Sequence, residues 1–263
     1  MNKAKIRAAT KELNPIDDIF FKKMAESLAF CQEILQVILE DKGIIVTECT
    51  PQFSGTNLQG RTVILDVKCT LGTGEQVNVE VQRSDNDDHQ RRVRYNGAVL
   101  TANTTDTGSK FSEVPDVIEI YISKFDIFSK GKTVYHIDRV IRETGDVVDN
   151  GLREVYVNAA VNDGSDIAEL MEVFCKSDSY NDKFPETSKR KRLFKENPKE
   201  AEVMNEAIQK LIDESKYEGK KEGKKEGVIS TLSSLVKDGI LTLAAAAQRA
   251  GMTEEAFKKM AML

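Results

Sequence analysis

Two stretches of alternating apolar and polar residues, joined by a glycine-containing turn, constrain this chain more than any other feature. Residues 61–70 read RTVILDVKCT and residues 76–82 read QVNVEVQ, and a period of two predicts a β-strand in each. One face of the first strand is expected to hold Val63, Leu65, Val67 and Cys69. The connection between the strands suits a three-residue hairpin loop in which Gly74 takes the left-handed conformation.

The expected register of this hairpin places two carboxylates opposite each other. If the hairpin is symmetric about Thr73, Asp66 faces Glu80 with the Cβ atoms about 4.5–5.5 Å apart, and Gln82 shares the face of Glu80. Facing like charges destabilise a sheet, whereas Mg²⁺ takes oxygen ligands and commonly uses one or two carboxylates. The alternative is a merely polar, solvent-exposed hairpin face, and a bulge would shift the register by one residue.

The rest of the chain predicts a mixed sheet flanked by helices. Helical spacing precedes residue 40, a strand is expected over 44–50, a loop over 51–60, and strands over 117–122, 133–137 and 155–161. This order favours an α/β fold of the α+β kind. We expect a core over residues 14–198, a long helix with an EGKK repeat over 199–227, and a small helical tail over 228–263. Each glycine of the repeat costs about 1 kcal/mol in a helix, so the end of the long helix is expected to be marginal.

Charge and cysteine content limit the classes of function. The formal net charge of −5 does not favour a nucleic-acid binder, so any DNA contact has to come from a local basic patch. Cys31, Cys49, Cys69 and Cys175 show no CxxC spacing, which argues against a zinc site and for reduced thiols in a cytosol. We find no signal peptide and no apolar run long enough to span a membrane, and therefore expect a cytoplasmic protein.

Four motifs, in order along the chain, resemble one protein family. Asp66, a hairpin and then Glu80-Val81-Gln82 are similar to the PD-(D/E)XK nuclease core, with Gln where Lys is usual. Near the start, DIFFKKM resembles the opening Asp-x-x-Phe-Lys helix of the recombination-promoting nucleases, a branch also described as transposases. QRRVRYNGAVL resembles the Arg/Tyr helix of that branch, and EGKKEGKKEG its Glu-Gly repeats. Two departures are Leu65, where a proline often precedes the Asp, and Asn96, which follows Tyr95 in place of a second tyrosine.

The resemblance implies a restriction-endonuclease-like core that hydrolyses DNA phosphodiesters with Mg²⁺ or Mn²⁺. Asp66, Glu80 and the carbonyl of Val81 would be the metal ligands. Asp18 would complete the acidic cluster, although an Asp in the first turn of a helix is also favoured by the helix dipole; Asp17 is the less suitable substitute. Gln82 would orient water or phosphate, and because it brings no positive charge we expect slow or conditional activity.

Basic residues outside the hairpin suggest where DNA binds. The helix after the second strand is expected to contact phosphates through Arg91, Arg92, Arg94 and Tyr95. The run from Lys189 to Arg192 is expected to be a solvated helix face, with a second DNA contact as the less favoured alternative. ILTLAAAAQRAGMTEEAFKKM near the C-terminus predicts two helices around a glycine. We interpret it as a packing or dimerising hairpin, because its second helix is poor in the Arg, Asn and Gln that read base edges.

The sequence therefore predicts a DNA endonuclease linked to recombination or transposition, with DNA as its partner and a homodimer left open. Three other functions stay open. A DNA-binding or assembly module could retain the nuclease fold with weakened chemistry. A structural protein could merely have a polar hairpin, and a transposase could catalyse strand transfer in place of simple hydrolysis.

Overall fold

The chain consists of two compact units, each with its own hydrophobic core. The computed structural model describes residues 11–56, 62–86 and 88–261, with the backbone alone over 211–212 and 214–226. The first unit is Met1–Asn205 and the second is Glu206–Leu263. Within the described ranges, no helix is both long and apolar enough to cross a membrane.

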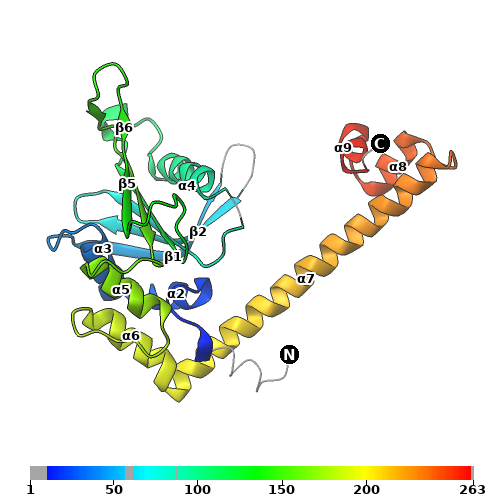
Figure 1. The fold of residues 1–263 in the computed structure, drawn as a ribbon. Coiled ribbons are helices and arrows are strands. Elements are labelled where there is room, and N and C mark those ends of the chain that lie inside the picture. The colour runs from blue at the N-terminus through cyan, green and yellow to red at the C-terminus, as the bar shows by residue number, and fades with distance from the viewer. Residues whose placement is uncertain (1–10, 57–61, 87, 262–263) are drawn as a thin grey trace. The chain divides into compact units, whose positions relative to one another are not determined.

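A six-stranded mixed sheet forms the centre of the first unit (Figure 1). Its strands, in spatial order, are β1 (Val46–Thr56), β2 (Thr62–Leu71), β3 (Gln76–Gln82), β4 (Val117–Ser123), β8 (Leu152–Asn158) and β5 (Val134–Ile137). β3, β4 and β8 run parallel to one another, and the other neighbours are antiparallel. A short second sheet pairs β6 (Arg139–Val140) with β7 (Val147–Val148). The expected α/β fold, a mixed sheet flanked by helices, is confirmed.

Helices cover both faces of the large sheet (Figure 1). One face is covered by α4 (His89–Thr104), which forms the crossover between the parallel strands β3 and β4. The other face is covered by α2 (Asp18–Met24), α3 (Leu28–Ile38) and α5 (Asp166–Cys175), with α6 (Pro185–Glu196) packed against α2 and α3. A short 3₁₀ helix, η1 (Phe111–Glu113), precedes β4. Because β3 is buried on both faces from Gln76 to Val81, the polar side chains of Asn78 and Glu80 lie inside the protein.

β1 continues through the stretch that the sequence predicts to be a loop. It runs to Thr56, so the loop expected over residues 51–60 is wrong as far as Thr56, and the remainder lies outside the described residues. Pro51 is tolerated because β1 is an edge strand, where a missing N–H need not break a ladder. Gly55 is needed because a Cβ there would lie 2.7 Å from Val99 Cγ1 of α4.

The basic run on α6 is not the solvated face that the sequence predicts. Lys191 is fully buried, and its ammonium donates to the carbonyl oxygens of Val173 at 2.8 Å and Ser179 at 2.9 Å. Burial lowers the Lys191 pKa to about 8. Arg190 donates to the carbonyl oxygens of Met24 and Lys23 at the end of α2. Arg190 and Lys191 therefore attach α6 to α2 and α5, because the carbonyl groups at helix ends need hydrogen-bond donors.

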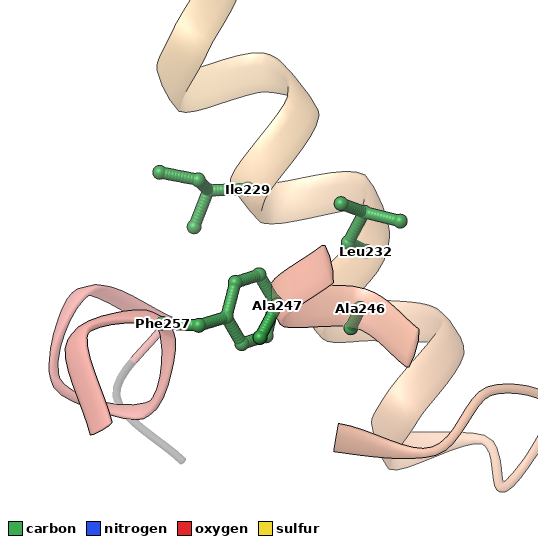
Figure 2. Packing of buried hydrophobic residues seen from close by; sticks show 5 residues of the cluster. All are labelled: Ile229, Leu232, Ala246, Ala247 and Phe257. Atoms are coloured by element: carbon green, nitrogen blue, oxygen red, sulfur yellow. The ribbon is translucent and has the colours of Figure 1, made fainter. Parts of the chain in front are cut away.

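The second unit is a small helical cluster at the end of a long helix. α7 (Pro198–Lys237) is helical through the glycines of the EGKK repeat, where the sequence predicts a marginal end. α8 (Leu243–Ala250) and α9 (Glu254–Ala261) follow, separated by Gly251 with φ of 68°. Figure 2 shows Phe257, Ala246 and Ala247 packed against Ile229 and Leu232 of α7. The predicted helix–glycine–helix hairpin is confirmed, and it packs within the chain.

Candidate active site

The β2–β3 hairpin has the register that the sequence predicts. Val67 pairs with Val79 and Lys68 with Asn78, which sets Asp66 opposite Glu80. Gly74 has φ of 95°, as the predicted turn requires. The acidic pair is therefore built by local hairpin geometry.

Asp66 and Glu80 are held together by crossed hydrogen bonds. The Asp66 N–H donates to Glu80 Oε1 at 3.1 Å, and the Val81 N–H donates to Asp66 Oδ2 at 3.1 Å. Each carboxylate thus accepts a hydrogen bond from a main-chain N–H of the opposite strand. Asp66 is 7% exposed and Glu80 2%, so the alternative of a solvent-exposed polar face is wrong.

The strand is irregular at Asp66. The β1–β2 ladder steps from Pro51–Val67 to Phe53–Leu65 without pairing the residues between them, and Gln52 has φ of 55°. Leu65 packs with Leu100 of α4, whereas Cys69 lies beside Cys49 and Cys31 of α3, on the opposite face. The expected single face for Val63 through Cys69 is therefore wrong, because the alternation is interrupted between Leu65 and Cys69, beside the left-handed Gln52 of β1.

Helix α2 brings one more acid and a cation to Asp66, Asp18 from its first turn and Lys22 from its last turn. Lys22 Nζ lies 3.1 Å from Asp66 Oδ1 and 2.6 Å from Asp18 Oδ1. Asp18 and Lys22 meet because residues four apart share a helix face. The structure thus brings Asp18 to the predicted site. Sequence reasoning missed Lys22, although its spacing from Asp18 was a usable signal.

Asp17, the substitute considered for Asp18, has a different position. Its Oδ1 accepts from Arg83 Nη1 at 2.6 Å, and its Oδ2 accepts from the Asn14 N–H at 2.8 Å. Arg83 directly follows β3, so this ion pair ties the start of α2 to the end of the strand that bears Glu80. Asp17 therefore positions α2, whereas Asp18 forms its ion pair with Lys22 at the acidic cluster.

The electrostatics of the pair disfavour two bare negative charges. Burial, followed by repulsion from Glu80 and Asp18, raises the pKa of Asp66 well above its ordinary value. Burial also raises the pKa of Glu80, with Arg92 and Lys22 opposing the shift. A nearby cation is what lowers such pKa values. The donor set is made of carboxylate oxygens, the hard ligands that Mg²⁺ and Mn²⁺ take, and it fits a divalent ion.

Gln82 is the last residue of β3, and its side chain turns toward the following loop. It sits on the same side of β3 as Glu80, two residues further along. Its Nε2 donates to the Ser84 carbonyl at 2.7 Å and to Asn86 Oδ1 at 3.3 Å. The loop therefore fixes the Gln82 amide.

A basic hollow lies between α4 and the start of β2. It has a volume of about 610 Å³, and its lining includes Thr62, Val63, Ile64, Asp88, Arg91, Arg92, Arg94, Tyr95 and Asn96. The three arginines are exposed, and Arg91 pairs with Asp88 at 3.2 Å. Arg92 is close enough to lower the pKa of Glu80. All four predicted DNA-contacting residues thus line one hollow that borders the acidic pair.

Glu119 on β4 is a buried carboxyl that sequence reasoning missed. It is 1% exposed, and its Oε2 accepts from Asn78 Nδ2 at 2.8 Å. Gly97 of α4 lies against this side chain, since a Cβ there would be in van der Waals contact with Glu119 Cγ at 3.4 Å. Burial, with smaller contributions from Glu80 and Glu154, raises its pKa well above the ordinary value. Glu119 is therefore protonated at pH values where an exposed glutamate is charged.

We expect Glu119→Gln to stabilise the protein increasingly as pH rises. A carboxyl whose pKa is raised in the folded state favours folding below its unfolded pKa, and that advantage is lost as pH rises toward the folded pKa. Above roughly pH 4.3, this group should lower the free energy of unfolding of the wild type by up to about 1.4 kcal/mol per pH unit. Denaturant unfolding of both proteins at several pH values measures the difference. A difference that does not grow with pH would show that Glu119 is charged in the fold.

Comparison with known proteins gives one family. A family model described as PD-(D/E)XK nuclease family transposase matches residues 15–161. The match includes α2, the β2–β3 hairpin and α4. Neither a curated protein nor a solved structure matches the chain.

Proposed function

This chain belongs to the PD-(D/E)XK nuclease family transposases, and on that premise we propose that it is a metal-dependent DNA endonuclease that hydrolyses phosphodiester bonds. The observation that carries the proposal is the convergence of Asp66, Glu80 and Asp18 from three elements. Two facing carboxylates on a buried strand pair cost stability unless a cation compensates their charge. The family supplies that cation, because PD-(D/E)XK nucleases generally use divalent metal ions.

Asp66 and Glu80 would hold Mg²⁺ or Mn²⁺, with Asp18 and the Val81 carbonyl as further ligands. When bound, the ion supplies Lewis acidity for the attacking water and offsets the charge of the phosphate. The protein has already arranged the two carboxylates through main-chain donors, so little reorganisation is required. Gln82, held by the loop at Ser84, would orient water or the scissile phosphate through its carbonyl or amide.

Lys22 would supply the positive charge that Gln82 lacks. Although burial opposes its charged form, the adjoining carboxylates of Asp66 and Asp18 raise its pKa, so it is an ammonium at neutral pH. In the metal-free protein it neutralises Asp66. A cation at this place also suits the developing negative charge of a phosphodiester during cleavage.

The hollow of Arg91, Arg92, Arg94 and Tyr95 would grip the DNA backbone next to the cut. Guanidinium groups match phosphate geometry, and three of them here form a local basic patch on a chain whose net charge is −5. Contacts of this kind bind DNA without reading its sequence. We further propose that the activity serves DNA recombination or transposition in the cytoplasm.

Supercoiled plasmid tests this function. We expect the purified protein to nick it with Mg²⁺ or Mn²⁺, and expect EDTA to stop the reaction. An Asp66→Ala/Glu80→Ala double variant should not cut. Absence of cutting by the wild type, with no metal-induced thermal shift, would leave a DNA-binding or assembly module. Joined products from a pre-cut donor DNA would indicate strand transfer.

A further inference from the structure

Three cysteines that are far apart in sequence converge in the structure. Cys31 comes from α3, Cys49 from β1 and Cys69 from β2. The sulfurs of Cys31 and Cys49 lie 2.6 Å apart, those of Cys49 and Cys69 lie 3.3 Å apart, and all three are within 4.8 Å of one another. Among the described residues, these three cysteines are the group of His, Cys, Asp or Glu side chains whose ligand atoms lie close enough together to share one metal ion.

Ordinary packing does not account for all of this arrangement. Buried cysteines are common as small hydrophobic residues, and one such residue would need no further explanation. Here three thiols point at one place, and the Ala25 carbonyl accepts from Cys31 Sγ at 3.4 Å and Cys49 Sγ at 3.3 Å. The cluster is therefore a polar one, with three sulfurs and one oxygen directed inward.

We propose that Cys31, Cys49 and Cys69 form a binding site for a thiophilic cation, Zn²⁺ or Cu⁺. Three thiolates are the ligands that such ions prefer over the carboxylates of the candidate active site. A zinc–sulfur distance of about 2.3 Å puts tetrahedral sulfurs roughly 3.8 Å apart, so the observed sulfurs need to move by about 1 Å. For Zn²⁺ the fourth ligand would be the Ala25 carbonyl or a water beside Cys49, which is partly exposed.

Without a metal, the electrostatics favour one thiolate and two thiols. Hydrogen bonds from Cys31 and then Cys69 lower the pKa of Cys49 to about 5, whereas hydrogen bonds with Cys49, together with burial, raise the pKa of Cys31 and of Cys69. A bound cation would therefore release the protons of those two thiols. Arg190 lies close enough to Cys31, and Lys68 close enough to Cys69, for charge interaction. Two cations thus flank a site whose three thiolates would leave a net negative charge. The expectation from spacing that there is no zinc site overlooked this convergence, because the ligands come from separate elements.

The bound ion would fasten α3 and the end of α2 to the β1–β2 edge of the sheet. Ala25 directly follows α2, which bears Asp18 and Lys22, and Cys69 lies on β2, which bears Asp66. The site would thus support the arrangement of the acidic cluster without taking part in its chemistry. It does not depend on the proposed nuclease function.

Reduced full-length protein, titrated anaerobically with Co²⁺ as a probe for Zn²⁺ and with Cu⁺ against a chromophoric chelator, tests the proposal. We expect one sulfur-ligated ion per chain, which for Co²⁺ gives a sulfur-to-metal charge-transfer band that carboxylate-bound Co²⁺ does not give. Cys49→Ser should weaken binding at least about 100-fold. The matched control is Cys175→Ser, because Cys175 lies on α5 outside the cluster, and it should bind as the wild type does.

Two further measurements keep the result independent of folding and of the active site. The charge-transfer band of the wild type alone reports sulfur ligation, so the test stands even if Cys49→Ser fails to fold. In Glu80→Gln the charge-transfer band should appear at the same Co²⁺ concentration as in the wild type, because the band reports the cysteine site alone. Absence of the band together with no uptake of Cu⁺ by the reduced wild type, or an equal band in a folded Cys49→Ser variant, would overturn the proposal.

Discussion

Glu80→Gln should reduce metal-dependent cleavage at least about 100-fold while leaving the metal-free protein at least as stable as the wild type. Glutamine keeps the acceptor for the Asp66 N–H and fits the same volume. The substitution removes a carboxyl group whose pKa is raised mainly by burial. The folded state therefore loses no stabilising charge at neutral pH. Activity falls because an amide is a poor ligand for Mg²⁺.

Plasmid nicking and thermal unfolding, each with and without Mg²⁺, measure both halves of this prediction. A ligand present at 100 times its Kd stabilises the folded state by about 2.7 kcal/mol, and we expect that stabilisation in the wild type only. Glu119→Gln is the matched control, since it makes the same change at another buried glutamate of the neighbouring strand. It should cut normally. Full activity in Glu80→Gln would remove Glu80 from the metal site.

The sequence predicts the parts of this site that arise from local rules. Period-two alternation and the left-handed Gly74 define the hairpin register, which is enough to set Asp66 opposite Glu80. The DIFFKKM motif indicates a helix near the start, and an acid such as Asp18 is favoured in a first helical turn by the helix dipole. These features need no knowledge of distant contacts.

Other parts depend on contacts between distant segments, which no local pattern records. The interruption of alternation at Leu65 depends on the left-handed backbone of Gln52 in the neighbouring strand. The burial of Glu119 depends on the approach of α4 at Gly97. The cysteine cluster likewise requires α3 to dock on β1. A single sequence shows none of these tertiary arrangements.

Lys22→Met should lower the cleavage rate by about 10²–10³-fold with little change in the KM for DNA. Methionine retains most of the apolar stem, which packs beside the sheet, and removes only the charge. The loss of rate follows if the ammonium acts on the charge that develops during cleavage. Metal-free stability should also fall, because removing one partner of a buried pair leaves Asp66 without its counter-charge.

Lys23→Met is the matched control for this variant. Lys23 is the next residue on the same helix, and it pairs with Glu26 at 2.5 Å, away from Asp66. Single-turnover cleavage under saturating Mg²⁺ should be normal in Lys23→Met and slow in Lys22→Met. Wild-type rates in Lys22→Met would mean that the ammonium only holds Asp66 until the metal binds.

Gln82→Lys, made in the Lys22→Met background, tests whether cleavage requires a positive charge at the position of Lys22 or a positive charge anywhere in the site. The substitution restores the residue that PD-(D/E)XK nucleases usually have two positions after the acidic residue of the second strand. If cleavage recovers, the charge of Lys22 and the usual motif lysine are interchangeable, and α2 supplies from one side what β3 supplies elsewhere in the superfamily. If it does not recover, the position of Lys22 between Asp18 and Asp66 is itself required, because only there does one ammonium contact both acids.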